Sequence, residues 1–162
     1  MAVVLVEGIT DRIAVEAVAA KLGCDLDAAG IEIVPIGGAQ AIRRAAADHE
    51  GKRVVGLCDA GEERWFRRVL GDATYVCTAD LEDELIRALG PVRVEEVVAS
   101  QGELETFRNF QNQPAWRGRP VEAQLRRWLQ NGGRYLRYPP LLVEALDPER
   151  IPRPLVSVLG HV

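Results

Sequence analysis

Residues that often carry enzyme chemistry are scarce in this sequence. Cysteine occurs 3 times, as Cys24, Cys58 and Cys77, with wide spacing and no Cys-x-x-Cys pair. This pattern argues against a zinc site or a disulfide framework and indicates reduced thiols that pack as small apolar groups. Serine occurs only as Ser100 and Ser157, and neither lies in the strand-to-helix turn that presents a serine nucleophile.

Other familiar signals are also missing. His49 and His161 lie at a predicted helix end and near the end of the sequence, so we expect both at the surface. The motifs Gly-x-Gly-x-x-Gly and Gly-x-x-x-x-Gly-Lys-Ser/Thr are absent. The glycine doublet Gly37-Gly38 has two interpretations: it either turns the chain or lets the backbone approach a phosphate at a helix start. No apolar run reaches the roughly 20 residues of a membrane span, and no signal-peptide pattern precedes the first strand. We expect a cytoplasmic protein.

The net charge of −4 hides a division along the chain. Residues 1–99 carry 11 basic and 18 acidic side chains, whereas residues 100–162 carry 9 and 6. An acidic first part beside a basic second part would place a metal site next to a surface that attracts phosphate. The length suits one domain with a small appendage.

Short apolar runs alternate with helical patterns in the first part of the chain. Strands are predicted over 3–6, 31–36, 53–58 and 74–77, and helices over 11–22, 39–48, 62–70 and 81–89. This alternation predicts right-handed crossovers and a mainly parallel four-stranded sheet flanked by helices, which is an α/β fold.

The composition changes after about residue 91. Residues 92–100 begin as a helix or a short strand, and helices are predicted over 103–112, 120–130, 139–146 and 154–159. We therefore divide the chain into an α/β domain at 1–91 and a helical C-terminal extension at 92–162. The connectors are short, which favours an extension packed on the first domain.

Carboxylates follow three of the predicted strands. Glu7 comes directly after the first, Asp59 ends the third, and Asp80 and Glu82 follow the fourth. Parallel sheets bring the carboxyl ends of their strands to one edge, so these acids should meet and repel one another. A hard divalent cation, which prefers oxygen ligands, relieves such repulsion. The sequence therefore predicts a metal site.

Some of these acids also have a purely structural interpretation. Asp11 and Asp80 are each placed to cap a helix, and Glu63 lies at a helix start, where the helix dipole favours an acid. Glu7 and Asp59 lack such a reason, because a carboxylate directly after a buried strand is costly unless it is solvated or liganded.

The order of these motifs resembles that of a known domain. Glu-Gly-x-x-Asp at 7–11, an aspartate at 59 and Asp-Leu-Glu at 80–82 resemble the TOPRIM domain, most closely the nuclease domain of the overcoming-lysogenization-defect (OLD) family. The motifs lie within 1–90, and 120–162 resemble that family's helical tail. The resemblance implies cleavage of nucleic-acid phosphodiesters with one or two Mg²⁺, Mn²⁺ or Ca²⁺ ions. The ligand candidates carried over are Glu7, Asp11, Asp59 and Glu82, with Asp80, Asp83 and Glu63 as further candidates.

The chain departs from that pattern in two respects. TOPRIM domains usually carry Asp-x-Asp at the second motif, but position 61 is glycine. Either Glu62 or Glu63 supplies the missing oxygen from the next turn, or one ion binds weakly. The family also couples this domain to an ATPase, and the missing phosphate loop assigns any ATPase to a separate subunit.

Arginines and aromatic residues alternate in the tail. The arginines are Arg117, Arg119, Arg126, Arg127, Arg134 and Arg137, and the aromatic residues are Trp116, Trp128, Tyr135 and Tyr138. Guanidinium groups bind phosphate and aromatic rings stack on bases, so we expect these arginines to bind nucleic acid, DNA rather than RNA. The alternative is a helical packing layer with solvated arginines. The resemblance further implies that Arg134 or Arg137 clamps phosphate at the active site, with a catalytic role beside Glu7, Asp11 and Asp59.

Two functional hypotheses follow. The first is a metal-dependent endonuclease. The second is a non-catalytic module of the same fold that binds nucleic acid or a partner ATPase, which Gly61 favours.

Overall fold

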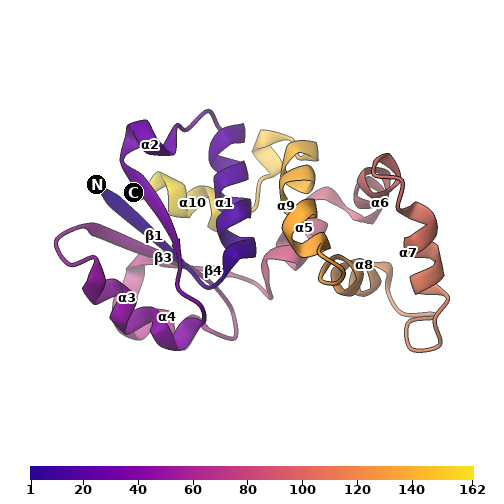
Figure 1. The fold of residues 1–162 in the computed structure, drawn as a ribbon, viewed down its shortest axis with the longest axis horizontal. Coiled ribbons are helices and arrows are strands. Elements are labelled where there is room, and N and C mark those ends of the chain that lie inside the picture. Colours follow the sequence, from indigo (N-terminus) through magenta and orange to yellow (C-terminus); the bar gives the residue numbers. More distant parts are fainter.

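The computed structural model describes residues 1–162, and its strands form one parallel sheet with the order β2-β1-β3-β4 (Figure 1). The strands are β1 (Ala2–Val6), β2 (Ile31–Pro35), β3 (Arg53–Asp59) and β4 (Thr74–Cys77). All three neighbouring pairs run parallel. The predicted four-stranded α/β fold is confirmed.

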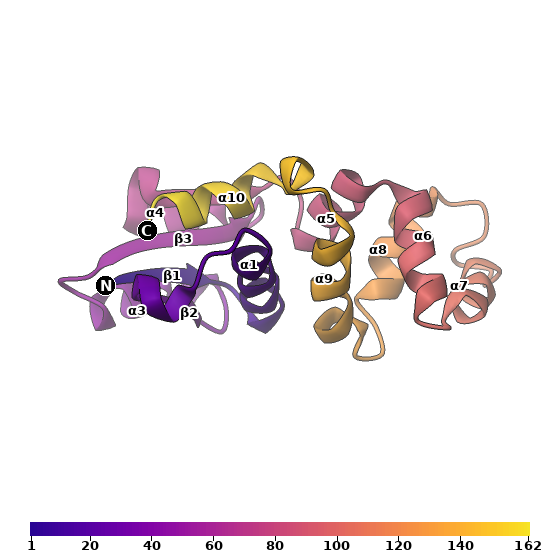
Figure 2. The same cartoon turned by 90° about the horizontal axis from the view of Figure 1, so that it is seen from above.

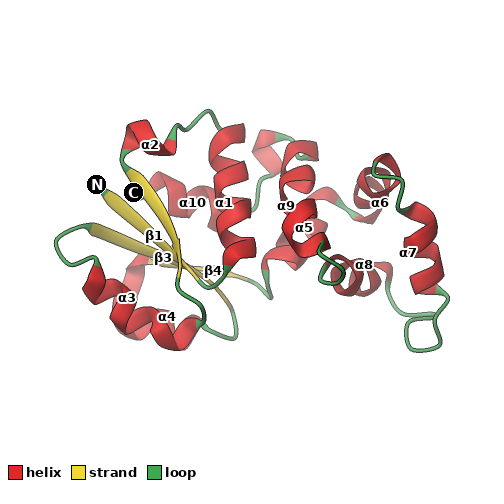
Figure 3. Ribbon diagram, viewed as in Figure 1, coloured by secondary structure: helices red, strands yellow, loops and turns green.

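Helices cover both faces of the sheet (Figure 3). Helices α1 (Ile9–Lys21) and α10 (Arg153–Gly160) pack on one face, and α3 (Ile42–Asp48) and α4 (Glu63–Leu70) pack on the other. Every residue of β1 is buried. Val4 and Val6 lie in the core that includes residues of α1 and α10, and Val3 and Leu5 lie in the core that includes residues of α3 and α4. This is the burial expected for a central strand between two helical layers.

Five further helices form a lobe at one end of the sheet (Figure 2). They are α5 (Leu81–Leu89), α6 (Pro91–Ser100), α7 (Leu104–Gln111), α8 (Val121–Leu129) and α9 (Arg134–Ala145). Helices α5 and α9 stand next to the α/β part, and the other three lie beyond them. No helix combines the length and apolar character that a membrane span requires.

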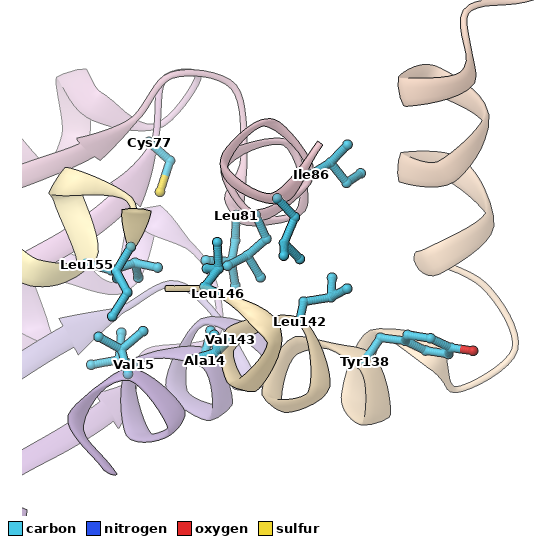
Figure 4. Close-up of a cluster of buried hydrophobic side chains, with 14 of the residues drawn as sticks. Ala14, Val15, Cys77, Leu81, Ile86, Tyr138, Leu142, Val143, Leu146 and Leu155 are labelled. Atoms are coloured by element: carbon cyan, nitrogen blue, oxygen red, sulfur yellow. The ribbon is translucent and has the colours of Figure 1, made fainter. Parts of the chain in front are cut away.

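One continuous core joins the lobe to the sheet. It contains 26 buried residues, and Figure 4 shows side chains of α1, α5, α9 and α10 meeting at the junction. Val15 of α1, Leu142 of α9 and Leu155 of α10 are among them. The lobe therefore packs on the sheet domain, and α10 returns from the lobe to cover the sheet. The division at residue 91 stays a prediction, because α5 packs with α6, α8 and α9 while α10 packs with β3 and β4.

Several helix boundaries differ from the predicted ones. The helix predicted over 39–48 is a 3₁₀ turn at Ala39–Ala41 followed by α3, and two further 3₁₀ turns cover Gly71–Ala73 and Pro148–Arg150. The short helix α2 (Leu26–Ala29) was not predicted. Residues 92–100 are helical within α6.

The largest difference is in α9, which begins at Arg134 although the pattern predicted a start at Pro139. Proline lacks the N–H group that an inner helical position donates, so it is usually found in the first turn. Here Pro139 and Pro140 both lie inside the helix. Burial of Tyr138, Pro139 and Leu142 in the packing of α9 against α1 and α5 offsets the lost hydrogen bonds.

Candidate functional site

A cavity of about 410 Å³ opens where the carboxyl ends of the strands meet the starts of α1 and α5. Five carboxylates line it, those of Glu7, Asp11, Asp59, Asp80 and Glu82. The remaining lining residues are Gly8, Thr10, Gly37, Gly38 and Leu81. The structure thus brings together acids from three separate motifs at one sheet edge. We call this the acidic cavity.

The turn after β1 places the first two acids. Gly8 precedes α1 as its N-cap residue, and its N–H donates to Asp11 Oδ2 over 2.9 Å. The expectation that Asp11 is the N-cap is wrong, because the helix begins at Ile9 and Asp11 lies within its first turn. Burial raises the pKa of Asp11, and the charge of Asp80 raises it further, although the bond from Gly8 lowers it.

Glu7 is held through its backbone rather than its side chain. Its carbonyl oxygen accepts the N–H groups of Gly37 (3.0 Å) and Gly38 (3.3 Å). Both glycines have positive φ values, 77° and 121°, which other residues rarely adopt. The glycine doublet is therefore a turn that fixes the end of β1 and lines the acidic cavity. Burial first, then the charges of Glu62 and Asp11, raise the pKa of Glu7.

Asp59 is the last residue of β3, and its carboxylate has no cationic partner in the structure. Burial raises its pKa to about 7, with further contributions from the charges of Asp11, Asp80, Glu7 and Glu82. A carboxylate with such neighbours is costly to ionise. This is the repulsion that the strand-end pattern predicts.

Position 61, two residues later, has room for a side chain. A Cβ built on Gly61 would meet no atom within 4 Å, and its φ is not positive. The two glutamates considered as substitutes differ in position. Glu62 lines a neighbouring cavity together with Glu7, Gly37 and Gly38, whereas Glu63 pairs with Arg67 at 2.5 Å. Glu62 is therefore the better placed of the two, and Glu63 lies outside the acidic cavity.

The start of α5 supplies the last acids. Asp80 is the N-cap residue and accepts the N–H of Asp83 over 2.9 Å. Glu82 also lines the cavity, and its pKa is raised by burial and by the charges of Asp80 and Asp11. Asp83 instead pairs with Arg87 over 2.8 Å and does not line the cavity.

One arginine of the helical lobe pairs with an acid of the acidic cavity, although it does not line the cavity itself. Arg126 of α8 donates from Nε to Asp80 Oδ2 over 2.7 Å. Its side chain is 43% exposed, so the guanidinium group stays accessible to a ligand. Sequence reasoning placed Arg126 on a nucleic-acid surface but not at the acids, because no local pattern relates positions 80 and 126.

Arg134 and Arg137 lie elsewhere. Both pair with Glu103, which also accepts the hydroxyl of Tyr138 over 3.0 Å. Arg134 is 15% exposed and lies over the ring of Trp128 at 3.9 Å from its centroid. Neither arginine lines the acidic cavity, so the clamp role implied by the resemblance has no support in this arrangement. Arg134 is mostly buried in the packing of the lobe, whereas Arg137 is about half exposed, and a phosphate-clamp role for either stays a prediction.

The other predicted nucleic-acid contacts are exposed. Arg117 donates to the carbonyl of Asn112 over 3.0 Å, and Arg119 lies 5.0 Å from the ring centroid of Trp116. Arg127 is exposed on α8. Their role in nucleic-acid binding stays a prediction.

The acidic cavity suits a hard divalent cation in its chemistry. Five carboxylates line it, and the pKa values of Glu7, Asp11, Asp59 and Glu82 are raised, so neighbouring groups do not neutralise these four. No three acidic, histidine or cysteine side chains already form a metal-binding group. Binding of an ion therefore requires some of these side chains to turn toward it.

Residues 1–59 match the family model described as "Overcoming lysogenization defect protein-like, TOPRIM domain". This part of the chain is therefore similar to the TOPRIM domain of OLD-like proteins. This agrees with the resemblance carried by the three acidic motifs, two of which, at Glu7–Asp11 and at Asp59, lie within the matched residues. A comparison with curated proteins finds no match.

Solved structures of OLD proteins have the same fold over the whole chain. The C-terminal region of the Burkholderia pseudomallei OLD protein superposes with a TM-score of 0.73 at 17% identity, covering 99% of this chain and 95% of that one. The C-terminal region of the Xanthomonas campestris pv. campestris OLD protein gives 0.71 at 21% identity, covering 99% and 91%. The helical lobe and α10 are thus part of the shared fold.

Proposed function

We propose that this chain is a metal-dependent nuclease that hydrolyses phosphodiester bonds of DNA. The observation that carries the proposal is the acidic cavity, where five carboxylates from separate motifs meet with few cations to neutralise them. Stable proteins rarely gather unpaired acids at one edge without a function for them. The OLD-type TOPRIM domain supports nuclease chemistry as that function.

Asp59, Glu7 and Glu82 would hold the ion, with Asp11 and Asp80 at its margin. Asp11 and Asp80 each have one oxygen engaged by a backbone N–H, which leaves them fewer free lone pairs. A bound divalent cation supplies a lowered pKa for an attacking water and stabilises the charge of the transition state. Mg²⁺ is the proposed ion, with Mn²⁺ as a substitute.

The chain's own groups would position the phosphate. Helices α1 and α5 both begin at the rim of the acidic cavity, so their N-terminal backbone dipoles favour a negatively charged ligand there. Arg126 would exchange its bond to Asp80 for one to a phosphate oxygen of the nucleic acid. This gives the helical lobe a share in substrate binding.

A second function is favoured by one feature. Gly61 stands where TOPRIM domains usually have a second aspartate, and no ready-made metal group is present. A module of this fold that binds nucleic acid or a partner without cleaving it would have the same surface. We also infer that an ATPase, if one takes part, is a separate subunit, and that the protein acts in the cytoplasm, where its three free thiols stay reduced.

A nicking assay on supercoiled plasmid separates the two functions. Wild-type protein is tested with Mg²⁺, with Mn²⁺ and with a chelator, beside Asp59→Ala and the matched control Glu63→Ala. Glu63 is an acid near the same strand end that lies outside the acidic cavity. We expect cleavage that needs the cation, is lost in Asp59→Ala and persists in Glu63→Ala. Equal cleavage by Asp59→Ala and wild type would make the assignment wrong, and DNA binding without cleavage would favour the non-catalytic module.

A further inference from the structure

A second cavity, of about 460 Å³, lies beside β4, between α4 and α10. Because β4 is at the edge of the sheet, no further strand covers this side. Its polar lining consists of Arg67, Thr74, Tyr75, Arg153, Ser157 and His161, and no carboxylate lines it. We call it the β4-edge cavity. Its charge is opposite to that of the acidic cavity.

Thr74 gives the β4-edge cavity an unsatisfied donor. The residue is only 5% exposed, and its Oγ1 is the single buried side-chain nitrogen or oxygen in the protein without a hydrogen-bond partner. A buried hydroxyl without a partner costs free energy that a ligand oxygen would recover. Because Thr74 lines the cavity, a rotation of its buried side chain would let this hydroxyl donate to an acceptor oxygen bound there.

The cations of this cavity come from two helices on opposite faces of the sheet. Arg153, at the start of α10, has no ion-pair partner, and Arg67 of α4 pairs with Glu63 through Nε, which leaves its terminal nitrogens available. Nδ1 of His161 lies 2.7 Å from the carbonyl oxygen of Ser157, so Nε2 is the free ring nitrogen. Guanidinium groups and hydroxyls that line one cavity are the kind of donors that recognise an oxyanion with several acceptor oxygens.

We propose that the β4-edge cavity binds the phosphate group of a small ligand, either inorganic phosphate or a nucleotide monophosphate. Arg153 and Arg67 supply the opposite charge, and Thr74 and Ser157 donate hydroxyl hydrogen bonds. The ring of Tyr75, whose centroid is 5.5 Å from that of His161, offers an aromatic surface for a base at the same place. This site lies on a different part of the sheet from the acidic cavity and does not depend on the nuclease proposal.

Calorimetric titration tests the site with three probes at constant ionic strength: inorganic phosphate, deoxyadenosine 5′-monophosphate and unphosphorylated deoxyadenosine. A chelator in the buffer prevents phosphate from binding through a metal ion at the acidic cavity. We expect both phosphate compounds to bind and the nucleoside to fail. Tighter binding of the monophosphate than of phosphate identifies the base as part of the ligand, and equal binding identifies phosphate alone. Failure of both phosphate compounds to bind would overturn the proposal.

Two substitutions locate the binding. Arg153→Gln should weaken phosphate binding about tenfold or more, and Arg64→Gln, the same change on the exposed side of α4, should leave it unchanged. Thr74→Val keeps the shape of the side chain and removes the unsatisfied hydroxyl. It should weaken phosphate binding about threefold and leave the urea midpoint of the free protein equal or higher. Wild-type phosphate affinity in either Arg153→Gln or Thr74→Val would contradict the assignment.

Plasmid nicking provides an independent readout. Arg153 and Thr74 lie outside the acidic cavity, so both variants should cleave at the wild-type rate without added phosphate. Asp59→Ala should in turn bind phosphate normally in chelator. Phosphate binding at the β4-edge cavity can therefore be found even if the protein does not cleave DNA. Cleavage can likewise be found even if this cavity binds no phosphate.

Discussion

Asp59 and Glu103 are both partly buried carboxylates, but their surroundings are opposite. Glu103, in the helical lobe, receives Arg134, Arg137 and the hydroxyl of Tyr138. Asp59, at the end of β3, has no such partner and faces other acids instead. Burial and repulsion raise the pKa of Asp59 to about 7. The contacts of Glu103 are instead two cations and a hydroxyl.

The difference separates a structural carboxylate from a functional one. Opposite charges and hydrogen bonds satisfy a structural carboxylate within the fold, so its removal should destabilise the lobe. A functional carboxylate is left unsatisfied until a ligand arrives, so its removal should cost activity and not stability. The predictions below test this contrast, beginning with the largest effect.

Asp59→Ala should lower metal-dependent cleavage at least about a hundredfold, since even the loss of a group that only orients a metal ligand costs about 10- to 100-fold. Its free energy of unfolding without metal should equal or exceed that of wild type, because one of the repelling charges is gone. Plasmid nicking and urea denaturation measure the two quantities. A strongly destabilised Asp59→Ala protein would assign Asp59 to the structural class.

Glu103→Ala should lower the free energy of unfolding by about 2–3 kcal/mol, because it leaves the partly buried Arg134 and the hydroxyl of Tyr138 without partners. Glu105→Ala changes an exposed glutamate in the first turn of α7, two residues after Glu103; it is the matched control and should have little effect. Urea denaturation measures both. If Glu103→Ala were as stable as its control, Glu103 would not be the centre of the lobe's ion pairs.

The stability of the metal-free protein should fall between about pH 4 and pH 7. In this window the carboxyl group of Asp59 is ionised in the unfolded chain, where its usual pKa is 3.8. In the folded protein it stays protonated until the pH approaches its raised pKa of about 7. The free energy of unfolding therefore falls as the pH rises from about 4 to about 7, and it stays lower above pH 7. Asp59→Asn should remove this loss. It should be more stable than wild type at pH 8 by roughly 1–2 kcal/mol, a value reduced by solvent screening at the half-buried side chain.

Urea denaturation in chelator across pH 4–8 measures this effect, and added Mg²⁺ should restore wild-type stability at pH 8. A wild-type protein whose stability rises steadily from pH 4 to pH 8 relative to Asp59→Asn would contradict the repulsion among the acids.

Gly61→Asp should strengthen metal binding, by about fivefold, because it adds a carboxylate where a side chain meets no obstacle. Gly61→Ala is the matched control for the backbone and should bind the ion as wild type does. Titration with Mn²⁺ compares the three proteins. Equal affinity in Gly61→Asp and Gly61→Ala would show that position 61 does not face the ion.

Local patterns in the sequence were enough to predict the sheet and its acidic edge. The apolar runs give the strands, and the rule that parallel strands share a carboxyl edge brings Glu7, Asp59 and Glu82 together. Helix α5 was predicted with its observed bounds, 81–89, since Asp80 caps its start and Gly90 ends it. Each of these features depends on residues close together in the chain.

Features that depend on tertiary contacts were not predicted. The pairing of Glu103 with Arg134 and Arg137 needs α7 and α9 to be placed first, so these arginines resembled free phosphate ligands. The bond from Arg126 to Asp80 likewise joins α8 to the start of α5. Asp83 and Glu63 matched the acidic motifs in sequence, but each is paired with an arginine one helical turn away.

Calorimetric titration of Mg²⁺ into wild type, Asp59→Ala and Glu103→Ala tests the central claim most directly, with binding as the readout whether or not the protein cleaves DNA. We expect wild type to bind the ion, Asp59→Ala to bind it at least about tenfold more weakly, and the folded fraction of Glu103→Ala to bind it as wild type does. Equal Mg²⁺ affinity in wild type and Asp59→Ala would contradict the central claim.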